Sequence, residues 1–113
     1  MTTKEAVSLE YRKKWLGMLK EIVLKHVDKN EYAVFLYGSA VNGLLKAHDF
    51  DIGILGKNKI EDRIVYRITD EIDESIIPMG VDIVDFVNTD EEFKKIALSE
   101  IEIWNNPKGI KLS

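Results

Sequence analysis

The stretch FLYGSAVNGLLKAHDFDIGI, residues 35–54, places Asp49 and Asp51 one residue apart in a segment with the apolar pattern of a β-strand. Aspartate is a poor strand former. Two like charges about 4 Å apart also repel by roughly 4 kcal/mol at the effective dielectric of a protein surface. The pair therefore indicates that something offsets the repulsion, and a bound cation would do so.

Side chains alternate across a strand, so Phe50, Ile52 and Ile54 are expected to share the core face. Asp49 and Asp51 then project from the opposite, open face. Their backbone positions lie about 6.6 Å apart at a rise of about 3.3 Å per residue. Rotation of the two side chains can bring their oxygens close enough to share a metal ion.

A later segment, VDIVDFV, begins at Val81 and predicts a second strand with the same alternation. If Val81 and Ile83 face the core, Asp82 joins the open face, whereas Asp85 points toward the core near the end of the strand. Three carboxylates from adjacent strands would suit Mg²⁺, which prefers carboxylates, water and substrate phosphates. The alternative is an acidic sheet face that is only solvated, and a DxD pair taken alone favours it.

The hexapeptide GSAVNG connects the two parts of the opening stretch. Gly38 permits a tight turn and close approach to a ligand, Ser39 supplies a hydroxyl, and the free amides of a following helix would bind phosphate. A plain turn capped by Ser39 explains the same residues equally well. Gly43 stands at the P-loop distance from Gly38, but Leu44 and Leu45 replace the Lys and Ser/Thr that a P-loop requires.

The remaining sequence alternates between helical and strand patterns. Apolar residues recur every three or four positions in the helical segments, and the strands are short apolar runs. Helices are expected at 3–27, 40–46, 60–77 and 90–104, and strands at 32–37, 50–55 and 81–87. This order indicates an α/β (α+β) domain with three or four strands, and we expect one domain over residues 1–113.

The composition excludes several classes of function. A formal charge of -4 argues against non-specific nucleic-acid binding, which relies on Lys and Arg. The chain has no cysteine, so it has no disulfide framework and no thiolate nucleophile. No apolar run is long enough to cross a bilayer, and the N-terminus lacks the apolar core of a signal peptide. We therefore expect a cytoplasmic protein that acts on a small molecule or on another protein.

A GS loop, nine further residues, a DxD pair and a later acidic residue together resemble the minimal nucleotidyltransferases of the DNA polymerase beta superfamily, which are related to kanamycin nucleotidyltransferase. The matching residues are Gly38, Ser39, Gly43, Asp49, Asp51 and Asp82. The resemblance spans nearly the whole chain. It implies the nucleotidyltransferase fold, a small mixed sheet of three or four strands with helices packed mainly on one face.

The resemblance also implies Mg²⁺-dependent transfer of a nucleotidyl group, expected to be AMP from ATP, to an acceptor hydroxyl. The loop residues Gly38, Ser39 and Gly43 would bind the nucleotide's phosphates. The catalytic residues and metal ligands would be Asp49, Asp51 and Asp82, with Asp82 beside the acceptor, where it could help to deprotonate the hydroxyl. Two Mg²⁺ ions about 4 Å apart can stabilise both the attacking and the leaving oxygen.

The sequence departs from the family pattern at three places. Asn42 replaces a basic residue, His48 stands where a serine commonly precedes the DxD pair, and the loop before Asp49 is about one residue shorter. None of these changes removes a metal ligand, but the loss of a positive charge would weaken triphosphate binding. His26, on the first helix, is expected to be structural or on the surface.

The larger relatives carry a second domain for the acceptor, so the resemblance implies that a partner supplies that site here. The implied partner is an all-helical HEPN toxin, with this chain as an antitoxin that adenylylates one of its tyrosines. The alternative is a catalytically weak or inactive antitoxin that neutralises its partner by binding alone, and a homo- or hetero-oligomer is compatible with both. An apolar contact surface is expected from Val84, Phe86, Trp104 and Ile110, although Trp104 fits the core equally well.

Overall fold

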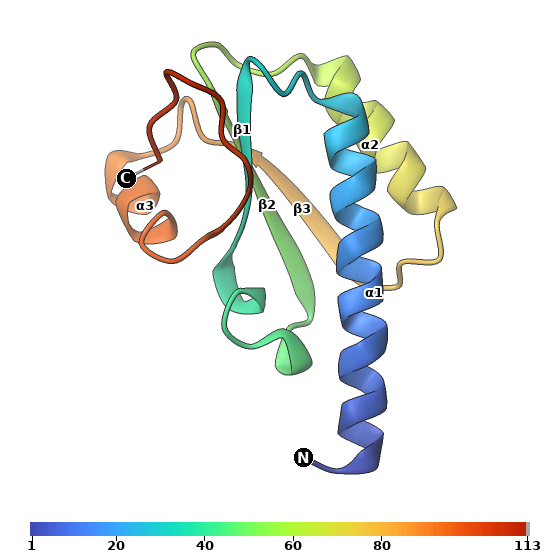
Figure 1. The fold of residues 1–113 in the computed structure, drawn as a ribbon. Coiled ribbons are helices and arrows are strands. Elements are labelled where there is room, and N and C mark those ends of the chain that lie inside the picture. The colour runs from blue at the N-terminus through green and yellow to red at the C-terminus, as the bar shows by residue number, and fades with distance from the viewer. Residues whose placement is uncertain (113) are drawn as a thin grey trace.

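The computed structural model describes residues 1–112, which form three α-helices, two 3₁₀ turns and four strands. In chain order these are α1 (Thr3–His26), β1 (Tyr32–Tyr37), η1 (Gly38–Ala40), η2 (Leu44–Lys46), β2 (Asp49–Gly56), α2 (Asp62–Glu74), β3 (Gly80–Asp85), α3 (Glu91–Ala97) and β4 (Glu102–Asn105). Figure 1 shows α1 and α2 side by side on one side of the sheet, with α3 and the C-terminal segment on the other. The expected α+β class is confirmed.

The four strands form one mixed sheet in the order β3-β2-β1-β4. β1 is antiparallel to both β2 and β4, whereas β2 and β3 are parallel. A parallel pair needs a crossover connection, and α2 provides it. Asp51 in β2 lies opposite Tyr37 on one side and opposite Asp82 on the other. This register determines the geometry of the candidate site.

The main core lies between the sheet and the two long helices. Alternate strand residues, including Leu36, Ile52 and Ile54, point toward this layer, where Leu19 of α1 and Ile68 of α2 meet them. All five side chains are at most 1% exposed. Burial of each such side chain is worth roughly 1.5–3 kcal/mol. Both helices are therefore held to the sheet by their apolar faces.

A second, smaller core covers part of the opposite face of the sheet. Phe35 and Phe86 are fully buried there, and their rings meet edge-on with centroids 5.0 Å apart. Leu112 of the C-terminal segment joins the same cluster. The expected contact surface is therefore wrong for Phe86, which is buried in this cluster. For Trp104, which is 8% exposed and packs in the main core, the alternative of a core position is confirmed.

Two predicted helices differ from the structure. In place of the helix expected at 40–46, residues 38–40 and 44–46 form two 3₁₀ turns, and Gly43 between them has backbone dihedrals of φ -145° and ψ 49°, which are not helical. The last helix ends at Ala97, and Trp104 lies in β4. Its side chain is buried while that of Ile103 is 51% exposed, which is the alternation of a strand. Pairing with β1 therefore overrides the helical spacing of the apolar residues.

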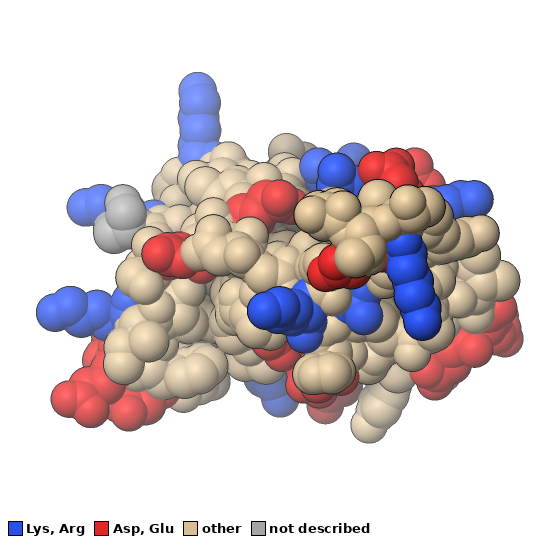
Figure 2. Space-filling view, turned by 90° about the horizontal axis from the view of Figure 1, so that it is seen from below, with Lys and Arg blue, Asp and Glu red and all other residues tan. Residues whose placement is uncertain are grey.

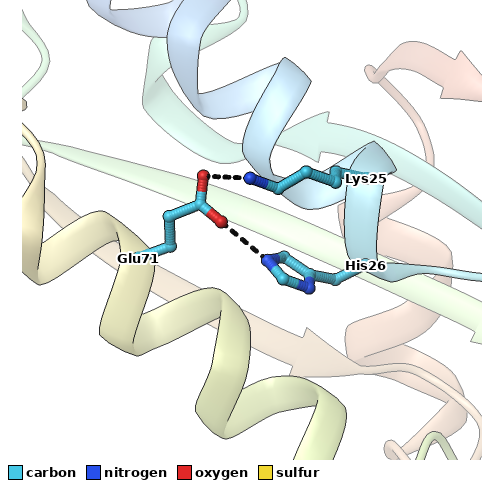
Figure 3. A network of polar contacts seen from close by, with 3 residues as sticks. All are labelled: Lys25, His26 and Glu71. Carbon is cyan, nitrogen blue, oxygen red and sulfur yellow. Dashed lines mark hydrogen bonds and ion pairs between the residues drawn. The ribbon is translucent and has the colours of Figure 1, made fainter.

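A polar network fastens the C-terminal end of α1 to α2 (Figure 3). Lys25 donates from Nζ to one carboxylate oxygen of Glu71 at 2.6 Å, and Nε2 of His26 lies 2.8 Å from the other. These two hydrogen bonds lower the pKa of the Glu71 carboxyl. His26 therefore has a structural contact, as expected. Among residues 1–112, no helix has the length and apolar character needed to cross a membrane.

Candidate active site

The carboxylates of the DxD pair and of Asp82 project from one face of the sheet. Asp51 and Asp82 are directly opposite each other in the parallel pair β2 and β3, and Asp49 is two residues before Asp51. Positions two apart on a strand share a face, as do directly paired positions. Asp49 and Asp82 are exposed and Asp51 is half-buried. The structure thus brings the three predicted aspartates together on the face that the alternation indicated.

Negative charge accumulates at this place. Burial raises the pKa of the Asp51 carboxyl, and the charges of Asp82 and Asp49 raise it further. Burial, together with Asp51 and Asp82, also raises the pKa of Tyr37 to about 12. No hydrogen bond contributes to the pKa of Asp51. The site is therefore electrostatically unfavourable by itself, and a cation would relieve it.

Two glycines leave the space that these carboxylates occupy. Gly38 has a φ of +79°, in the region that favours glycine, and a Cβ there would lie 2.5 Å from Oδ2 of Asp51. A Cβ at Gly80 would collide with Oδ1 of Asp49. The two glycines belong to different elements, η1 and β3. Backbone on both sides of β2 is thus shaped around the DxD pair.

The GS loop begins beside the carboxylates because Tyr37, the residue before it, is paired with Asp51. Gly38 and Ser39 are exposed. A Cβ at Gly43 would lie 3.3 Å from the carbonyl oxygen of Ser39, so the two ends of the loop approach each other closely. The expected helix is absent, because the loop forms a 3₁₀ turn. Any phosphate would be bound by the turn and the Ser39 hydroxyl rather than by the end of a helix.

The other singled-out residues have distinct surroundings. Asn42 donates from Nδ2 to the carboxylate of Glu100, which follows α3. His48 is exposed beside the DxD pair. Asp85 lies toward the far end of β3, where it accepts hydrogen bonds from the backbone N–H groups of Ile60 at 2.8 Å and Val87 at 3.0 Å. Asp85 is therefore a structural carboxylate and is not one of the three aspartates on the open face.

The sequence reasoning missed Tyr37 as a neighbour of the site. Its ring is 8% exposed and meets Phe86 edge-on at 5.1 Å between centroids. Phe93 of α3 extends the aromatic cluster outward and is 43% exposed. The available signal was an aromatic residue directly before the GS pair. This aromatic cluster lies beside Asp51 and Asp82, whose negative charges contribute to the raised pKa of Tyr37.

The donor set fits a hard cation, although it is not a finished metal cage. Within residues 1–112, no group of three or more His, Asp or Glu side chains is gathered closely enough to hold a metal ion as it stands. Mg²⁺ keeps several waters and takes substrate phosphates in place of an all-protein cage. The carboxylates of Asp49, Asp51 and Asp82 thus suit an ion that also binds a nucleotide. Figure 2 views the molecule from below and shows acidic and basic side chains interspersed on that face.

Known proteins provide an independent comparison. A protein of Haemophilus influenzae (strain ATCC 51907 / DSM 11121 / KW20 / Rd) named "Probable protein adenylyltransferase MntA" is 29% identical over 89 residues, which are 78% of this chain and 76% of the relative. Two solved structures share the fold. One is the tri-AMPylated Shewanella oneidensis HEPN toxin in complex with MNT antitoxin, with a TM-score of 0.59 and 13% identity over 82% of this chain and 71% of that chain.

The second solved structure is a toxin-antitoxin with AMP-PNP, with a TM-score of 0.60 and 15% identity over 78% of this chain and 70% of that chain. Identities this low show the fold alone. The family model described as "Polymerase beta, Nucleotidyltransferase" matches residues 18–108, which include the GS loop and all three aspartates. The expected fold and family are thus confirmed, and the chain belongs to the polymerase beta nucleotidyltransferase family.

Proposed function

We propose that this chain transfers AMP from ATP to a hydroxyl group of a HEPN-type partner protein, in a reaction that depends on Mg²⁺. The observation that carries the proposal is the pairing of Asp51 with Asp82 beside the Gly38 turn. It combines three acidic side chains with a loop whose Gly38 and Ser39 are exposed. The acceptor is assigned to a partner because the relatives with this fold include an antitoxin bound to an AMPylated HEPN toxin.

The reaction follows from the place of each residue. The exposed Ser39 hydroxyl and the glycine turn would bind the β- and γ-phosphates of ATP. Asp49, Asp51 and Asp82 would hold the Mg²⁺, which neutralises charge on the attacking and leaving oxygens when it is bound. The acceptor oxygen attacks the α-phosphorus, the bond to the bridging oxygen breaks, and pyrophosphate leaves. Asp82 would help to take the proton of the hydroxyl, and its exposure on the edge strand β3 supports this role.

Labelled nucleotide tests this proposal. The chain is incubated with Mg²⁺, ATP labelled at the α-phosphate and the HEPN protein that co-purifies with it, and label on the partner is measured. Asp49→Asn and Asp51→Asn should each reduce transfer by about 10²–10³-fold, the loss expected when a preorganised charged group is removed. Asp73→Asn, an exposed aspartate on α2, is the matched control and should retain full transfer. Transfer that survives both changes at the DxD pair would overturn the proposal.

A second function is favoured by the contact between Asn42 and Glu100. Where a basic residue would support the triphosphate, this loop has an amide that holds a carboxylate. An antitoxin that neutralises its partner by contact alone would tolerate this exchange. Growth of cells that express the toxin separates the two functions: the Asp49→Asn and Asp51→Asn proteins would still neutralise it in the contact function, and they would fail if AMP transfer is required.

A further inference from the structure

The segment between the GS turn and the DxD pair has few hydrogen bonds of its own. Its second turn, η2, contains one from the N–H of Lys46 to the carbonyl of Gly43 at 3.0 Å and one from Ala47 to Leu44 at 3.4 Å. The second is longer than the usual range of about 2.7–3.2 Å and is therefore weak. This segment sets the position of Asp49, because Ala47 is only two residues before it. Something outside the loop has to hold it in one conformation.

Arg12, in the projecting N-terminal half of α1, makes that contact. Its Nη1 donates to the carbonyl oxygen of Leu44 at 3.2 Å and to the carbonyl oxygen of Ala47. Its Nε lies 3.4 Å from the hydroxyl of Ser8, one turn earlier on the same helix, which steadies the guanidinium. The contacts join residues 32 and 35 positions apart. The side chain thus spans from α1 to both ends of η2.

Packing alone does not fix the direction of these carbonyl groups. The Ala47 side chain is 2% exposed and sits in the main core, which holds its Cα in place. The direction of its carbonyl determines how the chain enters His48 and then Asp49. A hollow of about 330 Å³ lies between the N-terminal part of α1 and η2, where Ser8, the neighbour of Arg12, lines it together with Leu45 and Lys46. The charge-assisted hydrogen bond from Arg12 is therefore the local means of orienting this peptide group.

We propose that Arg12 is a positioning residue for nucleotidyl transfer, acting through the carbonyl groups of Leu44 and Ala47 on the loop that carries Gly43 and leads to Asp49. The inference rests on the proposed function for its effect on the reaction. Its effect on the loop stands on the hydrogen bonds alone. Arginine suits the task because one planar group donates in two fixed directions, which a lysine ammonium does not reproduce.

Hydrogen exchange and steady-state kinetics test the role of Arg12. Arg12→Met keeps the aliphatic stem and removes the donors, Arg12→Lys keeps the charge, and Lys13→Met, next along the helix, is the control. In Arg12→Met the amides of residues 44–48 should exchange about tenfold faster, while those of β1 stay protected. kcat/KM for ATP should fall about 10–100-fold, the range for groups that orient ligands from behind. Arg12→Lys should recover only part of this loss.

Each other outcome overturns the proposal. If the amides of residues 44–48 exchange at the same rate in Arg12→Met as in the unaltered chain, Arg12 does not order the loop. If Arg12→Met and Arg12→Lys lose protection equally across residues 1–112, Arg12 stabilises the whole fold and has no specific effect on the loop. Full recovery in Arg12→Lys would mean that the planar guanidinium is not required, contrary to the proposal. If the unaltered chain transfers no nucleotide, the proposed function fails, whereas the exchange measurement still decides whether Arg12 orders the loop.

Discussion

The adjacent strands β2 and β3 carry acidic groups in two regions that differ in how their charge is treated. Near the end of β3, both carboxylate oxygens of Asp85 accept backbone N–H groups, from Ile60 and Val87. Beside the GS loop, Asp51 is partly buried and lies near the negative charges of Asp82 and Asp49. Both effects disfavour its charged form. The charge of Asp85 is thus stabilised by hydrogen-bond donors, whereas that of Asp51 is opposed by its neighbours, as we would expect of a carboxylate that binds a cation. The two regions should therefore respond oppositely to substitution.

The largest effect on stability is expected from Asp85→Ala. This change removes the acceptor for two half-buried backbone N–H groups, and each hydrogen bond to a charged group is worth about 1.5–3 kcal/mol. The free energy of unfolding, measured by urea titration, should fall by about 3 kcal/mol. Asp82→Ala, three residues earlier on the same strand, should cost less than about 0.5 kcal/mol because its side chain is exposed. Equal losses for the two variants would erase the distinction between the regions.

An intermediate effect is expected from Gly38→Ala, which tests how the active-site region is built. A residue with a side chain costs roughly 1–2 kcal/mol in the left-handed conformation, and the added Cβ would also press on Oδ2 of Asp51. Thermal unfolding should occur at a lower temperature, and AMP transfer should fall further than the stability loss explains. Gly17→Ala is the control with the opposite sign. Its Cβ meets nothing within 4 Å, and alanine favours a helix by about 1 kcal/mol.

The shared face of Asp49, Asp51 and Asp82 could be predicted from the sequence because it follows from the alternation of side chains along each strand. The period of two in residues 49–54 placed both aspartates of the DxD pair on one face, and the same period placed Asp82 with them. The paired register of Asp51 and Asp82 agrees with this. The alternation also predicted that Asp85 does not share the face of Asp82. It could not predict the two N–H groups that donate to Asp85, because no sequence pattern indicates them.

The parts that failed depend on contacts between distant segments. The apolar spacing up to Trp104 resembles a helix, but β1 offers an unpaired edge, and residues 102–105 pair with it. Similarly, Phe86 looked exposed because the covering segment near Leu112 has no pattern that indicates where it packs. Arg12 was overlooked because a lone arginine on an amphipathic helix looks like a solvated charge. Its carbonyl partners are more than thirty residues away.

The smallest expected effect is a gain in stability from Asp51→Asn. Because the pKa of Asp51 is raised in the folded protein, its ionised form is less stable there than in the unfolded chain. The penalty is absent below about pH 4, where the carboxyl is protonated in both states, and it is fully present at pH 7. Because the side chain is partly exposed and solvent screens its neighbours, the variant should be more stable at pH 7 by only about 0.5 kcal/mol, with a slightly higher melting temperature. The gain should shrink as the pH falls.

Added Mg²⁺ turns this gain into a test of the site. An ion that binds the folded protein raises its melting temperature by mass action, and here it also cancels the repulsion that Asp51 feels. The unaltered chain should therefore gain stability in millimolar Mg²⁺ with ATP, whereas Asp51→Asn, which has lost a ligand, should gain less, so the two melting temperatures converge. If the melting temperatures of the two proteins differ by the same amount at every Mg²⁺ concentration, the carboxylates beside the GS loop do not bind Mg²⁺.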